Sequence, residues 1–159
     1  MRLIFLSSLF AFVTDQLSKW WVVHGMDLAT KLSIDVLPPF LNFRMGWNTG
    51  INFGLFGGNT ENSRWILIGL ALAITAYVLI WTWRDRPGRV GQIAAGLLVG
   101  GALGNVIDRI VYGAVADFLN MSCCGINNPF TFNLADVWIF LGAFGLIFFS
   151  SPKKNKKGA

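Results

Sequence analysis

The sequence predicts an all-α membrane protein, a bundle of four transmembrane helices, and three observations lead to that fold class. The 159 residues are 54% hydrophobic and only 13% charged, with a mean hydropathy of +0.56, whereas an ordinary soluble domain carries about a quarter charged residues. Apolar stretches of spanning length recur along the chain, and the basic residues gather beside them. A chain of this length forms one domain, so we expect a single integral membrane domain over residues 1–159.

Four stretches are long enough to cross a bilayer, which takes roughly 20 mostly apolar residues in a helix. We expect helices at about 3–23, 65–83, 91–111 and 134–151. The first begins like a secretory signal, and polar residues interrupt its second half. Because no small-residue cleavage site follows it, we expect this helix to be retained.

The basic residues predict the orientation of the bundle. Arg2, the loop 84–89 and the lysines of the tail 152–159 fall on one side of the membrane if the chain crosses four times. The segment 24–64 on the other side balances its basic residues with acids, and 112–133 has no Lys or Arg. The positive-inside rule then makes both termini and the tail cytoplasmic and both longer segments external. This clustering also excludes a basic face for nucleic acid.

The first external segment is not a featureless linker. Residues 32–56 mix β-forming residues with Pro38-Pro39 and a cluster of glycines and asparagines, which predicts short strands and turns. Its apolar content is high for a segment wholly in water. We therefore expect it to lie on the membrane surface, with membrane lipids as partners.

Ionisable residues inside a membrane span are costly and mark function by default. Asp15 and Lys19 are four residues apart in the first helix and share a face. Asn105, Asp108 and Arg109 repeat that spacing in the third helix. Each set contains its own counter-charge, so the sequence leaves open that each is only a buried strut.

Asp117 and Asp136 differ, because no basic residue lies between Arg109 and Lys153. A carboxylate in apolar surroundings without a cation has a raised pKa, and two such groups close together cannot both ionise. One then holds a proton while the other stays charged, the division by which an aspartic peptidase activates water. Two alternatives stay open: Asp117 as a solvated loop acid, and Asp136 as the third residue of a helix capped by Asn133.

Other features carry less chemistry. Cys123 and Cys124 are adjacent, which fits neither a disulfide framework, nor metal-ligand spacing, nor a redox motif, and we interpret them as structurally incidental. His24 is the single histidine, at a helix end. The glycines of residues 48–54 could simply form a tight turn, and those of 100–104 could let helices pack closely. We find no zinc signature and expect no metal and no cofactor.

Five segments, in this order, resemble the lipoprotein signal peptidases, also called signal peptidase II. They are Asp15-Gln16-x-Ser18-Lys19, Asn48-x-Gly50-x-x-Phe53-Gly54, Gly101-x-x-Gly104-Asn105-x-x-Asp108-Arg109, Val115-x-Asp117-Phe118 and Phe132-Asn133-x-Ala135-Asp136. Each is weak alone, but five in order are specific. The resemblance covers nearly the whole chain, and no motif position departs from it.

The resemblance implies a bacterial inner-membrane aspartyl endopeptidase with four transmembrane helices, a small extracytoplasmic β-rich cradle and an active site near the outer face. It implies removal of the signal peptide from diacylglyceryl-modified prolipoproteins, just before the lipidated cysteine, and inhibition by globomycin. The implied catalytic pair is Asp117 and Asp136. The residues implied to bind substrate or support the pair are Asp15, Lys19, Asn48, Gly50, Asn105, Asp108, Arg109, Asn133 and Ala135.

Two other classes of function stay open. A small proton-coupled membrane transporter would also place acids and an arginine in helices. It is disfavoured because no inverted repeat is visible and because Asp117 and Asp136 fall near one surface rather than at mid-depth. A non-catalytic scaffold would not need carboxylates in apolar surroundings.

Overall fold

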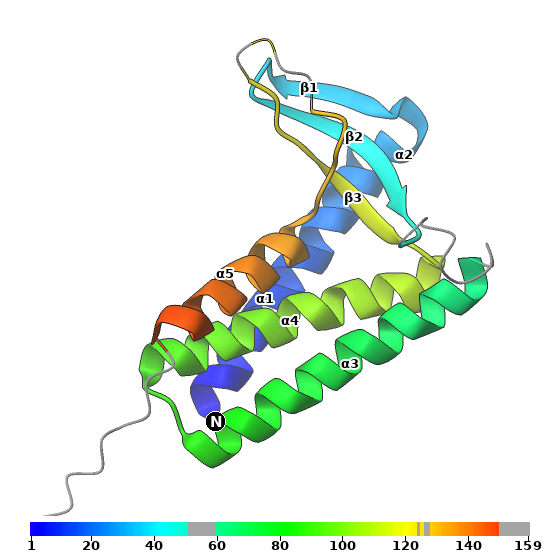
Figure 1. Ribbon diagram of the computed structural model, residues 1–159. Helices are drawn as coiled ribbons and strands as arrows, with labels where there is room; N and C mark the ends of the chain where they lie inside the picture. The colour runs from blue at the N-terminus through cyan, green and yellow to red at the C-terminus, as the bar shows by residue number, and fades with distance from the viewer. Residues whose placement is uncertain (51–59, 124, 126–127, 150–159) are drawn as a thin grey trace, which may run out of the picture.

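Helices carry most of the chain in the computed structural model, which describes residues 1–50, 60–123, 125 and 128–149. The long helices are α1 Arg2–Lys19, α3 Thr60–Asp85, α4 Arg89–Tyr112 and α5 Leu134–Phe149. Shorter elements are the π-helix η1 Trp20–Gly25, α2 Leu28–Lys31, and the strands β1 Ser33–Leu37, β2 Leu41–Asn48 and β3 Val115–Asn120. The helices form a bundle, and the sheet stands at one end of it (Figure 1).

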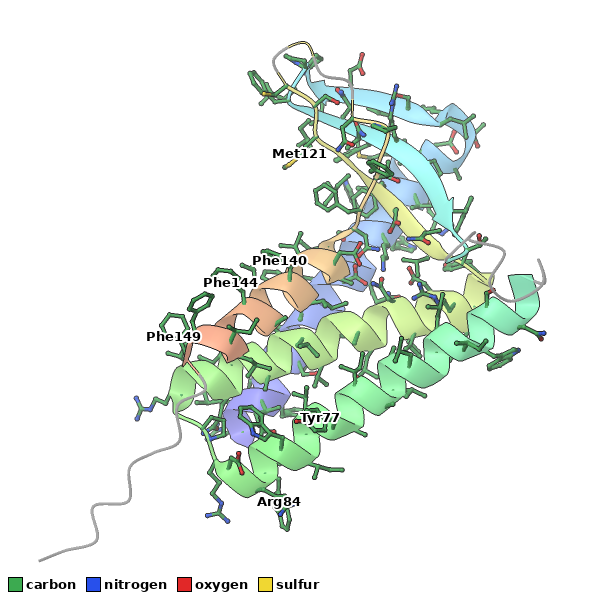
Figure 2. The ribbon with its side chains drawn as sticks, viewed as in Figure 1. Tyr77, Arg84, Met121, Phe140, Phe144 and Phe149 are labelled. Atoms are coloured by element: carbon green, nitrogen blue, oxygen red, sulfur yellow. The ribbon has the colours of Figure 1, made fainter. Side chains whose placement is uncertain are left out.

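Two of these helices, over Asn62–Asp85 and Arg89–Tyr112, are long and apolar enough to cross a membrane, and α5 is apolar but shorter. Large apolar side chains are exposed along the bundle, as a lipid environment requires. Figure 2 shows Phe140, Phe144 and Phe149 on the outer side of α5, pointing away from the other helices. The mostly helical architecture is therefore confirmed, whereas the crossing of a membrane by all four predicted helices stays a prediction.

Helix α4 lies at the centre of the bundle and contacts α1, α3 and α5. Its glycines let backbones approach closely, as small residues do in membranes. A Cβ atom at Gly100 would collide with the carbonyl oxygen of Ser8 on α1, and one at Gly101 would lie 2.5 Å from the carbonyl oxygen of Ala135 on α5. These contacts bring α1 and the start of α5 against the same stretch of α4.

The sheet is antiparallel, in the order β1-β2-β3, and its register sets Gly46 of β2 opposite Asp117 of β3. Its core joins Phe118 of β3 to Val22 of η1 and Leu28 of α2, all buried. The short strands predicted within residues 32–56 and the small β-rich region are thus confirmed. Residues 51–54 of the second motif lie outside the described residues.

Two local features were not predicted from the sequence. The first helix, expected at about 3–23, is an α-helix only to Lys19, and its helical backbone continues as the π-helix η1 to Gly25. No strand was predicted at Asp117, and Val115–Asn120 forms the third strand. Most of that strand is buried without alternation, so it lacks the apolar–polar pattern by which a half-buried strand is recognised. Asp117 is only 3% exposed, which excludes the solvated loop acid.

Candidate active site

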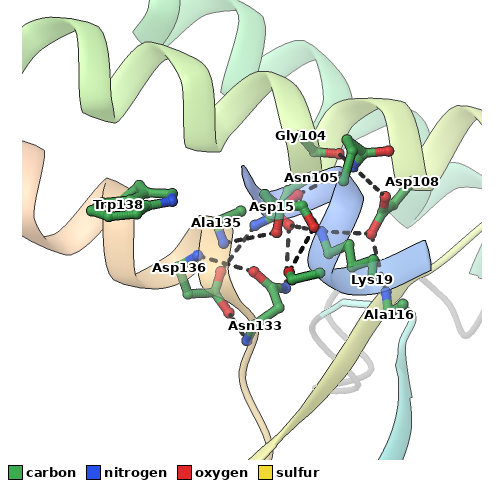
Figure 3. Close-up of polar contacts among 12 residues, drawn as sticks. Asp15, Lys19, Gly104, Asn105, Asp108, Ala116, Asn133, Ala135, Asp136 and Trp138 are labelled. Atoms are coloured by element: carbon green, nitrogen blue, oxygen red, sulfur yellow. Dashed lines mark hydrogen bonds and ion pairs between the residues drawn. The ribbon is translucent and has the colours of Figure 1, made fainter. Parts of the chain in front are cut away.

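The polar residues that the sequence singled out converge where α1, α4, β3 and the start of α5 meet (Figure 3). The sheet lies beyond this point, at the same end of the bundle (Figure 1). The site therefore combines side chains from segments up to 120 residues apart in the sequence.

Asn133 and Asp136 form the N-terminal cap of α5. The Asn133 side-chain oxygen accepts a hydrogen bond from the Asp136 N–H at 3.0 Å, and the Asp136 carboxylate accepts one from the Asn133 N–H at 3.2 Å. This reciprocal pair is a capping box. The capping alternative therefore describes the local geometry correctly. The cap engages only the Oδ2 atom of Asp136. The Oδ1 atom accepts a hydrogen bond of 2.9 Å from the side-chain amide of Asn105.

Asp117 lies on β3 and faces the cap. Its Oδ2 accepts a hydrogen bond of 2.9 Å from the side-chain amide of Asn48, and its Oδ1 accepts one of 2.5 Å from the side-chain amide of Asn133. Burial is the main cause that raises the pKa of Asp117 to about 6. The hydrogen bond from Asn48 lowers this pKa, the nearby charge of Asp136 raises it further, and the hydrogen bond from Asn133 lowers it. The two acids thus interact electrostatically and share Asn133 as a hydrogen-bond donor.

Lys19 bridges two buried carboxylates. Its ammonium group lies 2.8 Å from Asp15 and 2.8 Å from Asp108, and it donates a hydrogen bond of 3.1 Å to Asn105. The Lys19 side chain is 7% exposed, and those of Asp15 and Asp108 are 0% and 1% exposed. Removing Lys19 would leave both acids buried without a cation.

Asp15 and Asp108 also hold backbone in place. Asp15 accepts a hydrogen bond of 2.9 Å from the N–H of Ala135, and Asp108 accepts one of 3.2 Å from the N–H of Ala116. Ala135 directly precedes Asp136, and Ala116 directly precedes Asp117. Each buried acid thus fixes the backbone next to one of the two expected catalytic acids.

The expected pairing of Asp108 with Arg109 is wrong. Neighbouring residues on an α-helix point about 100° apart, and Asp108 turns toward Lys19 while Arg109 turns away. Arg109 donates a hydrogen bond of 3.3 Å to the Asn105 carbonyl, and its buried Nε has no hydrogen-bond partner among the described residues. The Arg109 charge interacts most with Asp117, then with Asp136 and least with Asp108. Asp117 and Asp136 therefore have no cation near them in the sequence but do have one in the folded protein.

Arg109 also lines a cavity of about 390 Å³ between α3, α4 and α5. The cavity is apolar except at one end, and its lining is Leu67, Leu70, Ala71, Ile74, Leu98, Ala102, Asn105, Arg109, Ile139 and Ala143. Asn105 links this cavity to the acids, because its side-chain amide donates to Asp136. An apolar chain with a polar group at one end would fit such a space.

Gly50 supports the site through its backbone. Its N–H donates a hydrogen bond of 3.0 Å to the side-chain oxygen of Asn48, which directs the Asn48 amide toward Asp117. Its φ angle of 102° is one that only glycine adopts readily. The tight-turn alternative is thus compatible with a role at the site.

The sequence reasoning gave no role to Gln16, although it belongs to the first motif. Its side-chain amide donates hydrogen bonds to Asp108 at 3.0 Å and to Asp15 at 3.1 Å, so it satisfies both partners of Lys19. A polar residue beside Asp15 in an apolar helix was the available signal. Cys123 is disulfide-bonded and lies outside this network. No cluster of three potential metal ligands occurs in the part of the chain that the structure describes.

A family profile described as Signal peptidase (SPase) II matches residues 7–151. The chain belongs to the signal peptidase II family. A lipoprotein signal peptidase of Rhodopseudomonas palustris is 38% identical over 150 residues, which are 92% of this chain and 90% of that protein. One of a Nostoc species is 38% identical over 152 residues, which are 96% of this chain and 91% of that protein.

Two solved structures of bacterial membrane enzymes, obtained by the in meso method, share the fold. Their TM-scores are 0.76 and 0.72, each at 29% identity over 91% of this chain, and they are covered to 89% and 84% of their own length. The protein is therefore a membrane peptidase of the signal peptidase II family. A transporter is not favoured.

Proposed function

We propose that the protein is an aspartic endopeptidase in which Asp117 and Asp136 activate water. One observation carries the proposal: Asn133 donates a hydrogen bond to each of the two carboxylates, which places them side by side with different surroundings. Asp117 is buried on a strand, while Asp136 is half-buried at the positive end of α5. Two carboxylates in unlike environments that interact electrostatically are suited to acid and base roles.

In the proposed reaction the charged carboxylate accepts a proton from a water molecule, and the water oxygen attacks the scissile carbonyl carbon. The protonated carboxyl group donates its proton toward the carbonyl oxygen, so that negative charge does not accumulate there. The carbon–nitrogen bond then breaks, and the departing amine takes a proton from the pair. A pKa of about 6 at Asp117 keeps that group able to exchange a proton near neutral pH. The proton belongs to the pair rather than to one residue.

For the substrate we propose diacylglyceryl-modified prolipoproteins, cut just before the lipidated cysteine. The relatives carry the name lipoprotein signal peptidase, and the cavity beside Asn105 and Arg109 is apolar over most of its lining. Each methylene group buried in it contributes about 0.8 kcal/mol. Arg109 would donate to a substrate backbone carbonyl through its guanidinium group. Globomycin, which inhibits the family that the sequence resembles, is proposed to occupy the same place.

We further propose that the whole chain is one integral membrane domain in the bacterial inner membrane, crossed four times, with both termini cytoplasmic. The acids lie at the sheet end of the bundle, whereas the basic loop 84–89 lies at the opposite end (Figure 1). With positive charge inside, the active site is near the outer face. Labelling of single cysteines in a variant without Cys123 and Cys124 tests this: a cysteine at position 84 should be labelled only from the cytoplasmic side.

The deciding experiment for the activity uses purified protein in detergent or lipid. A diacylglyceryl-modified prolipoprotein and its unmodified precursor are incubated with the enzyme in parallel, and the mass of each is followed. Release of the signal peptide from the modified substrate supports the proposal. A stable mass in both reactions, with a folded protein, would refute it.

A further inference from the structure

The end of the bundle opposite the sheet holds a second pocket, which the peptidase chemistry does not use. A cavity of about 280 Å³ lies there, lined by Met1, Ile4, Thr82, Trp83, Arg86 and Gln92. The start of α1, the end of α3 and the start of α4 form it, near the N-terminus marked in Figure 1. Because α3 and α4 contain the two helices of spanning length, their connection marks one membrane surface, and the pocket lies at that surface.

Arg86 occupies an unfavourable backbone position in this pocket. The Arg86 N–H donates to the Thr82 carbonyl at 3.1 Å directly after α3, and the Gly113 N–H donates to the Arg109 carbonyl at 3.2 Å directly after α4. Both residues adopt the left-handed backbone conformation, with φ angles of 44° for Arg86 and 79° for Gly113. Glycine ends helices in this conformation without steric cost, whereas a side chain is strained there. The turn itself would be better made by glycine, so the presence of arginine calls for a role of its side chain.

The Arg86 guanidinium is available to a ligand. Its side chain is exposed and makes no hydrogen bond or ion pair with the described residues. Residues 84–89 carry three arginines against one acid, and Arg84 projects from the same end of α3 (Figure 2). Gly88, at the N-cap of α4, provides no side-chain cap, so the positive end of that helix adds to the field. A guanidinium presents its donors in a planar fork that matches phosphate.

We propose that this pocket binds the phosphate group of an anionic phospholipid, with Arg86 as its principal ligand. A lipid fits better than free phosphate because the pocket combines arginine with apolar Ile4 and Trp83, and Trp83 is 62% exposed beside it. Basic pockets between transmembrane helices bind anionic headgroups in this way. A zwitterionic lipid binds more weakly, because its own ammonium group meets the same cluster of arginines.

The test compares lipids and variants on the full-length protein in neutral detergent. Phosphatidylglycerol and phosphatidylcholine with identical acyl chains are titrated, and bound lipid is measured by native mass spectrometry beside the melting temperature. We expect phosphatidylglycerol to bind more tightly and to raise the melting temperature more. Arg86→Gly should weaken its binding roughly fivefold or more, while leaving the lipid-free melting temperature unchanged or higher. Arg86→Lys should retain part of the affinity.

The matched control is Arg44→Gln, which removes one exposed positive charge from β2 at the other end of the molecule and should leave lipid affinity unchanged. Equal binding of the two lipids, or undiminished binding by Arg86→Gly, would overturn the proposal. So would a lower lipid-free melting temperature of Arg86→Gly, since the arginine would then serve the fold. Inorganic phosphate is titrated in parallel, and stabilisation equal to that by phosphatidylglycerol would identify a soluble anion instead.

Discussion

Asn133 donates its side-chain amide to Asp117 at 2.5 Å, and the same residue caps the helix that carries Asp136. One side chain therefore sets the distance between the two acids and ends the loop before α5. These two tasks use different atoms: the amide nitrogen contacts Asp117, and the oxygen receives the Asp136 N–H. They can be separated by substitution.

Asn133→Ser should keep the helix cap and lose the hydrogen bond to Asp117, because serine is a good N-cap residue but cannot donate to Asp117 as the amide does. Losing a hydrogen bond to a charged group costs about 1.5–3 kcal/mol, so kcat should fall roughly 10- to 100-fold at a nearly unchanged melting temperature. The pH profile should also shift upward, since the Asn133 hydrogen bond lowers the pKa of Asp117. Asn133→Ala, which loses both contacts, should in addition melt earlier. An unshifted pH profile of Asn133→Ser would contradict the effect of the Asn133 hydrogen bond on the pKa of Asp117.

Lys19→Met should act on the fold rather than on the chemistry. It leaves Asp15 and Asp108 buried without a cation, and breaking a buried pair in this way costs about 3–5 kcal/mol. The expected result is low yield and a strongly lowered melting temperature. Lys31→Met is the matched control, because Lys31 is exposed and, among the described residues, donates only to the Met26 carbonyl. Equal melting temperatures of the two variants would contradict the ion-pair network.

Arg109→Gln should behave in the opposite way, because Arg109 forms no ion pair with Asp108 and faces the cavity. The variant should fold normally, and kcat/KM should fall because a contact to the substrate backbone is lost. The measurement is cleavage kinetics beside a melting curve for both Arg109→Gln and Arg109→Lys. Full activity of a stable Arg109→Gln enzyme would remove Arg109 from the site.

Sequence reasoning identified the participants of this site better than their pairing. Spacing along a helix predicts which neighbours share a face, and it correctly paired Asp15 with Lys19. It could not show that Lys19 also pairs with Asp108, 89 residues later, since that contact depends on how closely α1 packs against the glycines of α4.

The location of Asp117 was also beyond local patterns. Val115–Asn120 is buried on nearly every residue, so neither alternation nor length marks it as a strand. Its pairing with β2, more than 60 residues earlier, creates the strand and brings Asn48 to Asp117. Such long-range pairing is decided by tertiary packing, which one sequence does not display.

Lipidation of the substrate should matter strongly. If diacyl chains enter the cavity beside Arg109, each buried methylene contributes about 0.8 kcal/mol, and the unlipidated precursor should have a much lower kcat/KM. Leu70→Asp, which places a charge in the cavity lining, should erase that preference more than Leu72→Asp, because Leu72 is also exposed on α3 but lies outside the lining. Equal cleavage of both substrates by the unmodified enzyme would indicate a general peptidase.

The pKa of Asp117 gives a further prediction about stability. In the folded protein it lies at about 6, above its ordinary value of 3.8, so the folded state holds this proton over a range in which the unfolded chain has released it. Folding stability should therefore fall as pH rises from about 4 to about 6. Asp117→Asn, which cannot ionise, should have a free energy of unfolding that is higher than the parent's at pH 7 by up to about 3 kcal/mol, and the difference should vanish near pH 4. A parent that is equally stable at pH 4 and pH 7 would contradict the raised pKa.

The catalytic pair itself allows the sharpest test. Asparagine resembles aspartate in shape but can neither hold the transferable proton nor carry the charge, so Asp117→Asn and Asp136→Asn should each abolish cleavage while remaining folded. If the two acids share one proton as proposed, the double variant should be little worse than either single one, and the parent should show a bell-shaped pH profile belonging to the pair. Cleavage of the modified prolipoprotein is measured after equal expression and folding are verified. Substantial turnover by a folded Asp136→Asn enzyme would exclude that residue, and Asp108, whose carboxylate is held by Lys19, Gln16 and the Ala116 N–H, would be the next to substitute.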